Sequence, residues 1–161
     1  MSRKKKVSFE PYDEDNEKHH KQGLQMCIDF WKERKQQLPF IDGVNMLEMY
    51  EKMERLAHMF VLEDRNGDVV AMGGTMEMPV SIGSMSLGSI AVRPEERGKG
   101  FGSQIVKDIE QVISSQLRYF GTPACTIYLS CFDDSLPFWE KMGYHVLETR
   151  TVDTLMSKTL W

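Results

Sequence analysis

A glycine-rich run between a strand-like segment and a helix-like segment constrains this chain more than any other feature. The run Arg97–Gly102 reads Arg-Gly-Lys-Gly-Phe-Gly, follows the apolar stretch Met85–Val92, and precedes apolar residues at helical spacing over residues 105–117. Three glycines in five positions let the backbone approach a ligand closely. The N–H groups at a helix start suit a phosphate or pyrophosphate. Arg97 and Lys99 add local positive charge, so the sequence predicts an anion-binding loop.

Two familiar phosphate-binding motifs do not fit this run. The P-loop needs Gly-x-x-x-x-Gly-Lys followed by Ser or Thr, but here Gly98-Lys99 is followed by Gly100. The dinucleotide fingerprint needs Gly-x-Gly-x-x-Gly, whereas the third glycine here, Gly102, stands one position too early. The remaining alternative is a glycine-bearing surface turn, which the coincidence of glycines, basic residues and a helix start disfavours.

Length and charge bound the kind of molecule. A chain of 161 residues corresponds to a single domain over residues 1–161, and 41% apolar with 27% charged residues is an ordinary globular composition. The net charge of −4 makes nucleic acid an unlikely partner and slightly favours a cationic or neutral substrate. Residues 1–6 are expected to form a basic, mobile tail.

Targeting signals and metal motifs are not apparent. The apolar stretches are far shorter than the roughly 20 residues that cross a bilayer, and the basic start has no apolar segment behind it. We therefore expect a cytoplasmic protein with no membrane association. The three cysteines, Cys27, Cys125 and Cys131, lack C-x-x-C spacing, which predicts reduced, mostly core thiols and no metal site.

Apolar periodicity predicts the remaining elements. Strands are expected at Val7–Tyr12 and at residues 59–63, 69–76, 85–92, 126–129, 144–147 and 154–159. Helices are expected at residues 17–36, 44–57, from the glycine run to 117, and 135–142. Asn66-Gly67 predicts a hairpin turn. His19 and His20 are expected on a solvated helix start, and Met72, Met76 and Met78 on a core-facing strand surface.

Two linked motifs resemble the GNAT superfamily of N-acetyltransferases. Arg97–Gly102 matches the signature Arg/Gln-x-x-Gly-x-Gly/Ala, and Ile90–Pro94 is similar to the strand before it. Ser135–Tyr144, which reads Ser-Leu-Pro-Phe-Trp-Glu-Lys-Met-Gly-Tyr, resembles the second motif, Asn-x-x-Phe-Tyr-Glu-Lys-x-Gly-Phe. The two motifs stand in the family's order, and the matching core covers about residues 60–160.

The resemblance implies an α/β (α+β) fold. Its central sheet is open, mixed and mostly antiparallel, with six to seven strands and about four flanking helices. A splayed parallel strand pair, here residues 87–92 and 126–129, holds the cofactor. Many relatives dimerise through the closing strands, so a homodimer is a further expectation.

The resemblance also implies acetyl-CoA as co-substrate and no metal. The strand backbone at residues 90–92 pairs with the pantetheine arm, the amides of residues 98–103 hold the pyrophosphate, and Ser135 stands where an Asn often touches the cofactor. The expected cofactor-binding residues are Ile90, Ala91, Val92, Arg97, Gly98, Lys99, Gly100, Phe101, Gly102, Ser103, Ser135 and Phe138.

The implied reaction is direct attack of an amine on the thioester, which needs a route for the amine proton and often an acid for the thiolate. The family's usual acid is a Tyr, but this chain has Trp139, whose indole does not serve as an acid at neutral pH. Tyr128, Tyr144 and Cys131 are substitute candidates for the acid. Glu77 is the candidate base, and Ser86 and Ser89 are candidates to order a relaying water.

The leading hypothesis is therefore an acetyl-CoA-dependent N-acetyltransferase that acts on a primary amine. The acceptor is a small molecule, or a protein Lys or N-terminus, and the sequence does not choose between them. A non-catalytic coenzyme A-binding or structural protein with the same fold is the alternative, supported by Trp139. Another acyl donor, such as a succinyl or longer-chain coenzyme A, is a third possibility.

Overall fold

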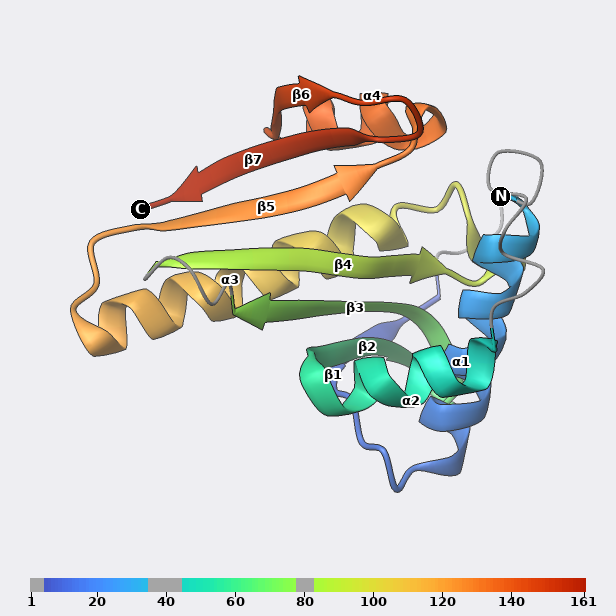
Figure 1. The fold of residues 1–161 in the computed structure, drawn as a ribbon. Coiled ribbons are helices and arrows are strands. Elements are labelled where there is room, and N and C mark those ends of the chain that lie inside the picture. Colours follow the sequence, from blue (N-terminus) through green and yellow to red (C-terminus); the bar gives the residue numbers. More distant parts are fainter. Residues whose placement is uncertain (1–4, 35–44, 78–82) are drawn as a thin grey trace. The chain divides into compact units, whose positions relative to one another are not determined.

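The computed structural model describes residues 5–34, 45–77 and 83–161. The elements, in chain order, are β1 (Val7–Pro11), α1 (Glu17–Lys32), α2 (Met46–Leu56), β2 (His58–Asp64), β3 (Val69–Glu77), β4 (Ser84–Val92), the 3₁₀ turn η2 (Pro94–Glu96), α3 (Phe101–Phe120), β5 (Cys125–Cys131), the 3₁₀ turn η3 (Asp133–Ser135), α4 (Leu136–Lys141), β6 (His145–Thr149) and β7 (Thr154–Leu160) (Figure 1). Apart from the two 3₁₀ turns, these elements confirm the strands and helices that periodicity predicts, except that α1 ends at Lys32 and that residues 35, 36 and 44 of the predicted helices lie outside the described residues.

The strands are hydrogen-bonded in the order β1-β2-β3-β4-β5-β7-β6. β1 and β2, β5 and β7, and β6 and β7 pair antiparallel, whereas β4 and β5 pair in parallel. The expected open, mixed, mostly antiparallel sheet with a parallel strand pair and four α-helices is thereby confirmed for the described part of the chain.

Two compact units divide the chain. The first unit contains Met1–Gly74 and Ser89–Asp108, and the second contains Thr75–Gly88 and Ile109–Trp161. β3, β4 and α3 each contribute residues to both units. The expectation of a single domain over residues 1–161 stays a prediction.

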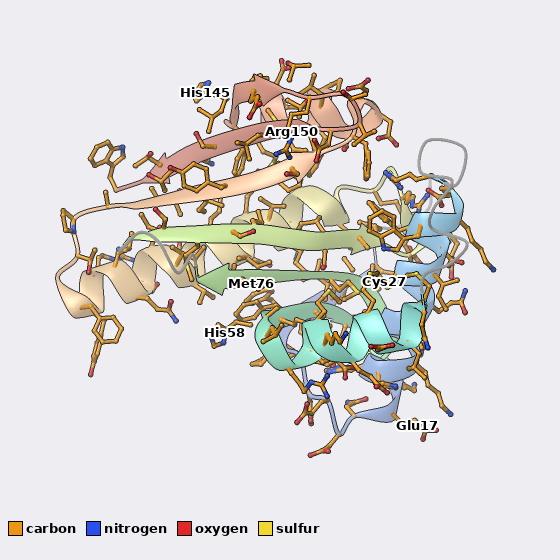
Figure 2. The ribbon with its side chains drawn as sticks, in the orientation of Figure 1. Glu17, Cys27, His58, Met76, His145 and Arg150 are labelled. Carbon is orange, nitrogen blue, oxygen red and sulfur yellow. The ribbon has the colours of Figure 1, made fainter. Side chains whose placement is uncertain are left out.

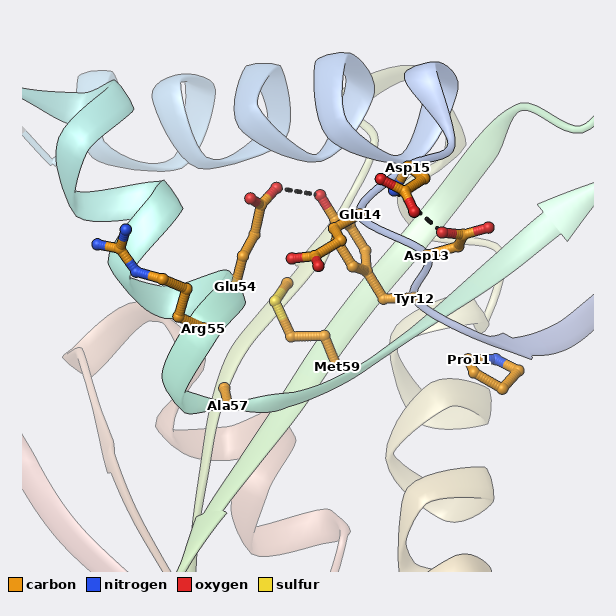
Figure 3. Close-up of a pocket in the computed structure, with 9 residues that line it drawn as sticks. All are labelled: Pro11, Tyr12, Asp13, Glu14, Asp15, Glu54, Arg55, Ala57 and Met59. Carbon is orange, nitrogen blue, oxygen red and sulfur yellow. Dashed lines mark hydrogen bonds between the residues drawn. The ribbon is translucent and has the colours of Figure 1, made fainter.

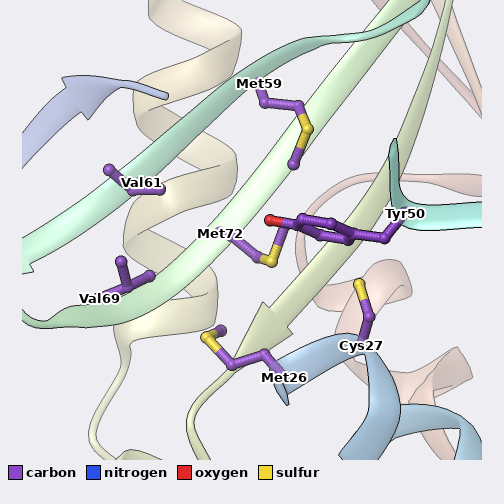
Figure 4. Close-up of a cluster of buried hydrophobic side chains, with 7 residues drawn as sticks. All are labelled: Met26, Cys27, Tyr50, Met59, Val61, Val69 and Met72. Carbon is purple, nitrogen blue, oxygen red and sulfur yellow. The ribbon is translucent and has the colours of Figure 1, made fainter. Parts of the chain in front are cut away.

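The core of the first unit forms where α1 and α2 meet β2 and β3. Its buried side chains are Met26, Cys27, Tyr50, Met59, Val61, Val69 and Met72 (Figure 4). Gly23 of α1 allows this packing, because a Cβ there would lie only 2.0 Å from the Tyr50 hydroxyl oxygen. Burial raises the pKa of Cys27 to about 12, so its thiol is protonated at neutral pH.

The turn between β2 and β3 has the expected hairpin chemistry. The Gly67 amide donates to the Asp64 carbonyl oxygen at 3.0 Å, and Gly67 has a φ of +76°. The Asp64 carboxylate accepts from the amides of Asn66 and Asp68 at 2.8 and 3.1 Å. The turn is therefore fixed by one side chain and by a glycine in the left-handed region.

His19 is not on a solvated surface, and that expectation is wrong. Its side chain is buried near the start of α1, where Nδ1 accepts from the Asp13 amide at 2.9 Å and Nε2 bonds Glu63. Because Nδ1 accepts, the proton of the neutral ring is on Nε2 and is donated to Glu63. The ring thus ties α1 to β2.

The second unit has its own core. Alternate residues of β5 are buried, as in a strand with one packed face. Buried side chains on α3, β5, α4 and β7, and in the link between α4 and β6, include Ile109, Ile113, Ile127, Leu129, Trp139, Tyr144 and Met156. The Arg150 guanidinium, labelled in Figure 2, bonds both carboxylate oxygens of Asp153 and the Ser130 hydroxyl. It fixes the turn before β7.

Two smaller expectations have different outcomes. Met72 is fully buried as expected, but Met76 (Figure 2) is 41% exposed and Met78 lies outside the described residues.

Within the expected basic tail, the Lys5 ammonium is held by ion pairs with Glu96 at 2.7 Å and Asp64 at 3.5 Å. Among the described helices, none is long and apolar enough to cross a membrane.

Candidate functional site

The glycine-rich loop joins the end of β4 to the start of α3. Gly98 and Gly100 have φ values of +74° and +85°, which place both in the left-handed region. Such conformations are rare for residues with a side chain. An added Cβ at Gly98 would meet no atom within 4 Å, so the glycine is required there by its backbone and not by crowding.

The first turn of α3 follows this loop directly. Its first helical hydrogen bond runs from the Gln104 amide to the Gly100 carbonyl at 3.0 Å. Phe101 is buried and anchors the helix start, while Gly102 and Ser103 are half-buried. A helix N-terminus carries a partial positive charge and directs N–H groups beyond its end. The loop therefore has the backbone geometry of an anion site.

The cations of the loop are paired with carboxylates. Arg97, exposed at the surface, lies 2.8 Å from a Glu33 oxygen at the end of α1 and donates through Nε to the Val92 carbonyl. Lys99 lies 3.0 Å from Glu96. These acidic partners reduce the positive charge that Arg97 and Lys99 alone would give, so the patch is weaker than the sequence predicts.

Glu96 is the buried carboxylate beneath the loop. It accepts from Lys5 on one oxygen and Lys99 on the other, and these ammonium groups hold its pKa below the usual range. Sequence analysis missed Glu33 and Lys5 as neighbours of the loop. Nothing in their local pattern signals pairings that join residues so far apart in the chain.

The backbone conformation of β4 becomes irregular at Ser89, before the strand reaches the loop. It is in parallel register with β5 at Ser84–Ser86, opposite Thr126–Tyr128, yet β4 runs on to Val92. Ser89 has a φ of +57°, the left-handed region that a residue with a side chain adopts only at a cost. The three residues expected to meet the pantetheine arm, Ile90, Ala91 and Val92, are half-buried and follow this point.

The second motif forms η3 and α4. The Ser135 hydroxyl donates to the Phe132 carbonyl at 3.1 Å, and it makes no side-chain cap bond to α4. Phe138 is half-buried, and its ring lies 5.0 Å from that of Trp139. Trp139 is buried and in turn packs edge-on against Tyr144 at 5.2 Å. The aromatic position that gives the family its usual acid is here part of the core.

The candidate proton-transfer residues have unlike surroundings. Tyr144 is 1% exposed, its hydroxyl has no hydrogen-bond partner among the described residues, and burial raises its pKa. Cys131 is buried, its thiol faces the Met156 sulfur at 3.5 Å, and burial raises its pKa. Tyr128 is half-buried and is in register with Ser86, the last paired residue of β4. The side chain of Glu77 lies outside the described part of the structure.

A separate pocket lies in the first unit. It has a volume of about 590 Å³ and is lined by Pro11, Tyr12, Asp13, Glu14, Asp15, Glu54, Arg55, Ala57 and Met59 (Figure 3). The Tyr12 hydroxyl donates to Glu54, accepts from Tyr50 at 3.0 Å, and has its pKa raised by burial and by Glu54. His20 bonds the same Glu54 oxygen at 2.7 Å. None of the nine lining residues belongs to either motif.

Comparisons with known proteins bear on the family and the fold of this chain. A family model described as the acetyltransferase (GNAT) domain matches residues 55–146, more than half of the chain. Among curated proteins, none matches this sequence.

Several solved structures have the same fold. An aminoglycoside 6'-N-acetyltransferase in complex with coenzyme A is 17% identical over 94% of this chain and 96% of its own, with a TM-score of 0.69. The PaiA N-acetyltransferase of Thermoplasma acidophilum, also bound to coenzyme A, is 12% identical over 96% and 99%, with a TM-score of 0.68. A GNAT acetyltransferase of Staphylococcus aureus is 11% identical over 97% and 100%, again at 0.68. At these low identities the structural similarity shows the fold alone. Because the family model matches more than half of the sequence, the chain belongs to the GNAT acetyltransferase family.

Proposed function

We propose that this protein is an acetyl-CoA-dependent N-acetyltransferase that acetylates a primary amine. One observation carries the proposal: Gly98 and Gly100 have positive φ immediately before α3 begins. Consecutive amides in such a turn form a concave, electropositive surface that suits a pyrophosphate. Membership of an acetyltransferase family supports acyl transfer as the reaction class.

The residues present fit coenzyme A. The amides of Gly98–Ser103 would hold the pyrophosphate, with Arg97 and Lys99 as the neighbouring cations. The backbone of Ile90–Val92 would pair with the pantetheine arm, because β4 continues past its last residue in register with β5. Ser135 and Phe138 of the second motif are proposed as further cofactor contacts.

Acetyl-CoA supplies an activated thioester: the amine nitrogen bonds to the carbonyl carbon, the carbon–sulfur bond breaks, and the amine gives up one proton as the thiolate leaves. For the thiolate we propose Tyr128 as proton donor, because it is half-buried, whereas Tyr144 and Cys131 are packed in the core. Glu77 is proposed as the base that receives the amine proton, directly or through water. Coenzyme A thiolate is only modestly basic, so the donor is expected to contribute less than the binding geometry.

The acceptor is proposed as a cationic or neutral primary amine. The net charge of −4 supports this weakly, and it is compatible with a small molecule or with a protein Lys or N-terminus. The similarity to the aminoglycoside and PaiA enzymes is one of fold, so it does not assign their acceptors to this chain. A cytoplasmic location and a homodimer through the closing strands stay predictions.

Two measurements test the proposal. Calorimetry of acetyl-CoA with the purified protein is expected to give one site per chain. A thiol-release assay over a panel of polyamines, aminoglycosides and peptides is expected to give at least one acceptor with release above hydrolysis. Absence of heat at high acetyl-CoA concentration would contradict the proposed function at its first step.

A second candidate function rests on Trp139. This indole is 7% exposed and packs against Tyr144, so the position of the usual acid is filled by a core side chain. A non-catalytic protein that binds coenzyme A would have no need of that acid. Saturable coenzyme A binding with no thiol release from any amine would favour this candidate over the enzyme.

A further inference from the structure

We propose that Gln22, a residue of α1 outside both motifs, positions the cofactor loop through Arg93. The inference rests on the proposed function, since the loop in question is the one that would hold coenzyme A. Gln22 belongs to no sequence pattern that points to a site, and its role follows from its contacts alone.

Both polar atoms of the Gln22 side chain are engaged. Oε1 accepts from Arg93 Nη2 at 2.7 Å and from the Val69 amide at 2.6 Å. Nε2 donates to the Asp68 carboxylate at 2.9 Å. One amide group therefore connects α1 to the start of β3 and to the residue that follows β4.

Arg93 is the first residue after β4 and connects this strand to the loop. Its amide donates to the Val70 carbonyl at 2.9 Å, and its carbonyl accepts from the Glu96 amide, also at 2.9 Å. Its guanidinium is largely buried against Gln22. With backbone and side chain both fixed, Arg93 sets the direction in which Pro94–Glu96 and then Arg97 leave the strand.

Losing this anchor is expected to affect binding more than chemistry. Amides that hold a pyrophosphate must match its oxygens closely, and small misplacements are costly. Without Gln22, the Val69 N–H loses its acceptor and the buried Arg93 guanidinium keeps only the exposed Glu95 carboxylate, 3.5 Å from Nε, so this end of the loop is free to shift. The expected signature is a higher KM for acetyl-CoA with kcat little changed.

The experiment compares Gln22→Met with Gln25→Met. Gln25 is on the same helix but is exposed, and its amide bonds only Asp29 of that helix among the described residues. We expect Gln22→Met to weaken coenzyme A binding by about tenfold and to raise KM equally. Gln25→Met is expected to bind as the wild type does. Equal affinity of the two variants would overturn the inference.

A double-mutant cycle separates positioning from a general loss of stability. If Gln22 acts through Arg93, then Gln22→Met and Arg93→Met each weaken coenzyme A binding, and the double variant is no weaker than Arg93→Met alone. Additive losses would mean that Gln22 reaches the loop by another route, which contradicts the proposal.

An isosteric exchange covers the case in which Gln22→Met does not fold. Gln22→Glu keeps the oxygen that accepts from Arg93, but it replaces the donor Nε2 with a second oxygen, which repels the Asp68 carboxylate. Adding Asp68→Asn restores a donor to that oxygen, so coenzyme A affinity lost in Gln22→Glu should return in the pair. Failure of the double variant to recover any of the lost affinity would overturn the proposal.

A wild-type protein that binds no coenzyme A contradicts the proposed function itself, whereas wild-type binding with unchanged affinity in Gln22→Met contradicts this inference alone.

Discussion

The two motifs that this chain shares with its family differ in what they expose. The loop residues Arg97–Gly100 are all exposed, and two of them are glycines in the left-handed region. In the second motif, Trp139, Met142 and Tyr144 are buried. The first motif exposes its backbone and the second forms part of a core, so a function inferred from sequence is safer for the loop than for the aromatic positions.

The largest expected effect comes from giving the loop a side chain. Gly98→Ala should weaken coenzyme A binding by about 100-fold, because a left-handed alanine costs about 1 to 2 kcal/mol and the loop will shift to relieve it. Gly121→Ala is a matched control, since Gly121 also has positive φ and open space around it but stands after α3. Both variants should lose similar thermal stability, and calorimetry should separate them. Equal coenzyme A affinities would refute the backbone role.

The second largest expected effect is on kcat and comes from replacing a tyrosine of the second unit. Tyr128→Phe should lower kcat by about tenfold, which is less than general acid catalysis usually contributes, because the coenzyme A thiolate is a modest base. Tyr144→Phe should leave kcat unchanged and raise the free energy of unfolding by about 1 kcal/mol, because it removes a buried hydroxyl without a described partner. The reverse pattern, with kcat lost only in Tyr144→Phe, would return the acid to the second motif.

A smaller effect tests the ion pairs of the loop. Glu33→Gln should strengthen coenzyme A binding by about two- to threefold at low salt, because it frees Arg97 and removes a negative charge near an anion. Glu17→Gln on the same helix is the control, since Glu17 (Figure 2) is exposed and pairs with Lys21. The gain should vanish at high salt. A loss of affinity in Glu33→Gln would mean that Glu33 orients Arg97 for the ligand.

The smallest effect concerns acid stability. Lys5 and Lys99 hold the pKa of Glu96 below its ordinary value of 4.5, so its stabilising contribution is present above that value and is lost as the pH falls through the folded-state pKa. Glu96→Gln should therefore lower Tm more at pH 7 than at about pH 3. The control variant Glu51→Gln, at an exposed glutamate of α2, should shift Tm equally at both. A Glu96→Gln deficit independent of pH would show that the ion pairs do not matter.

Sequence patterns predicted what repeats along the chain. The apolar run of β5, the stripe on α3 and the Asn66-Gly67 turn are local signals, and the structure confirms the elements that they predict. The tight turn before α3 was also predictable, because glycines adopt the left-handed backbone that Gly98 and Gly100 have there.

Pairings between distant polar residues left no such signal. Lys5 with Glu96, Glu33 with Arg97, and the three partners of Gln22 depend on how separate elements pack. His19 looks like any polar residue at a helix start, yet it is buried against Glu63. Periodicity states which face is apolar, but it does not state which polar side chain meets which.

The most direct test of the loop is an amide chemical-shift titration of the wild-type protein with coenzyme A. The account predicts the largest shifts at the amides of Gly98, Gly100 and Gly102, whose glycine signals fall in a sparsely populated region of the spectrum. Unperturbed loop glycines, with shifts confined to other residues such as Tyr12 and Asp13 of the separate pocket, would contradict it.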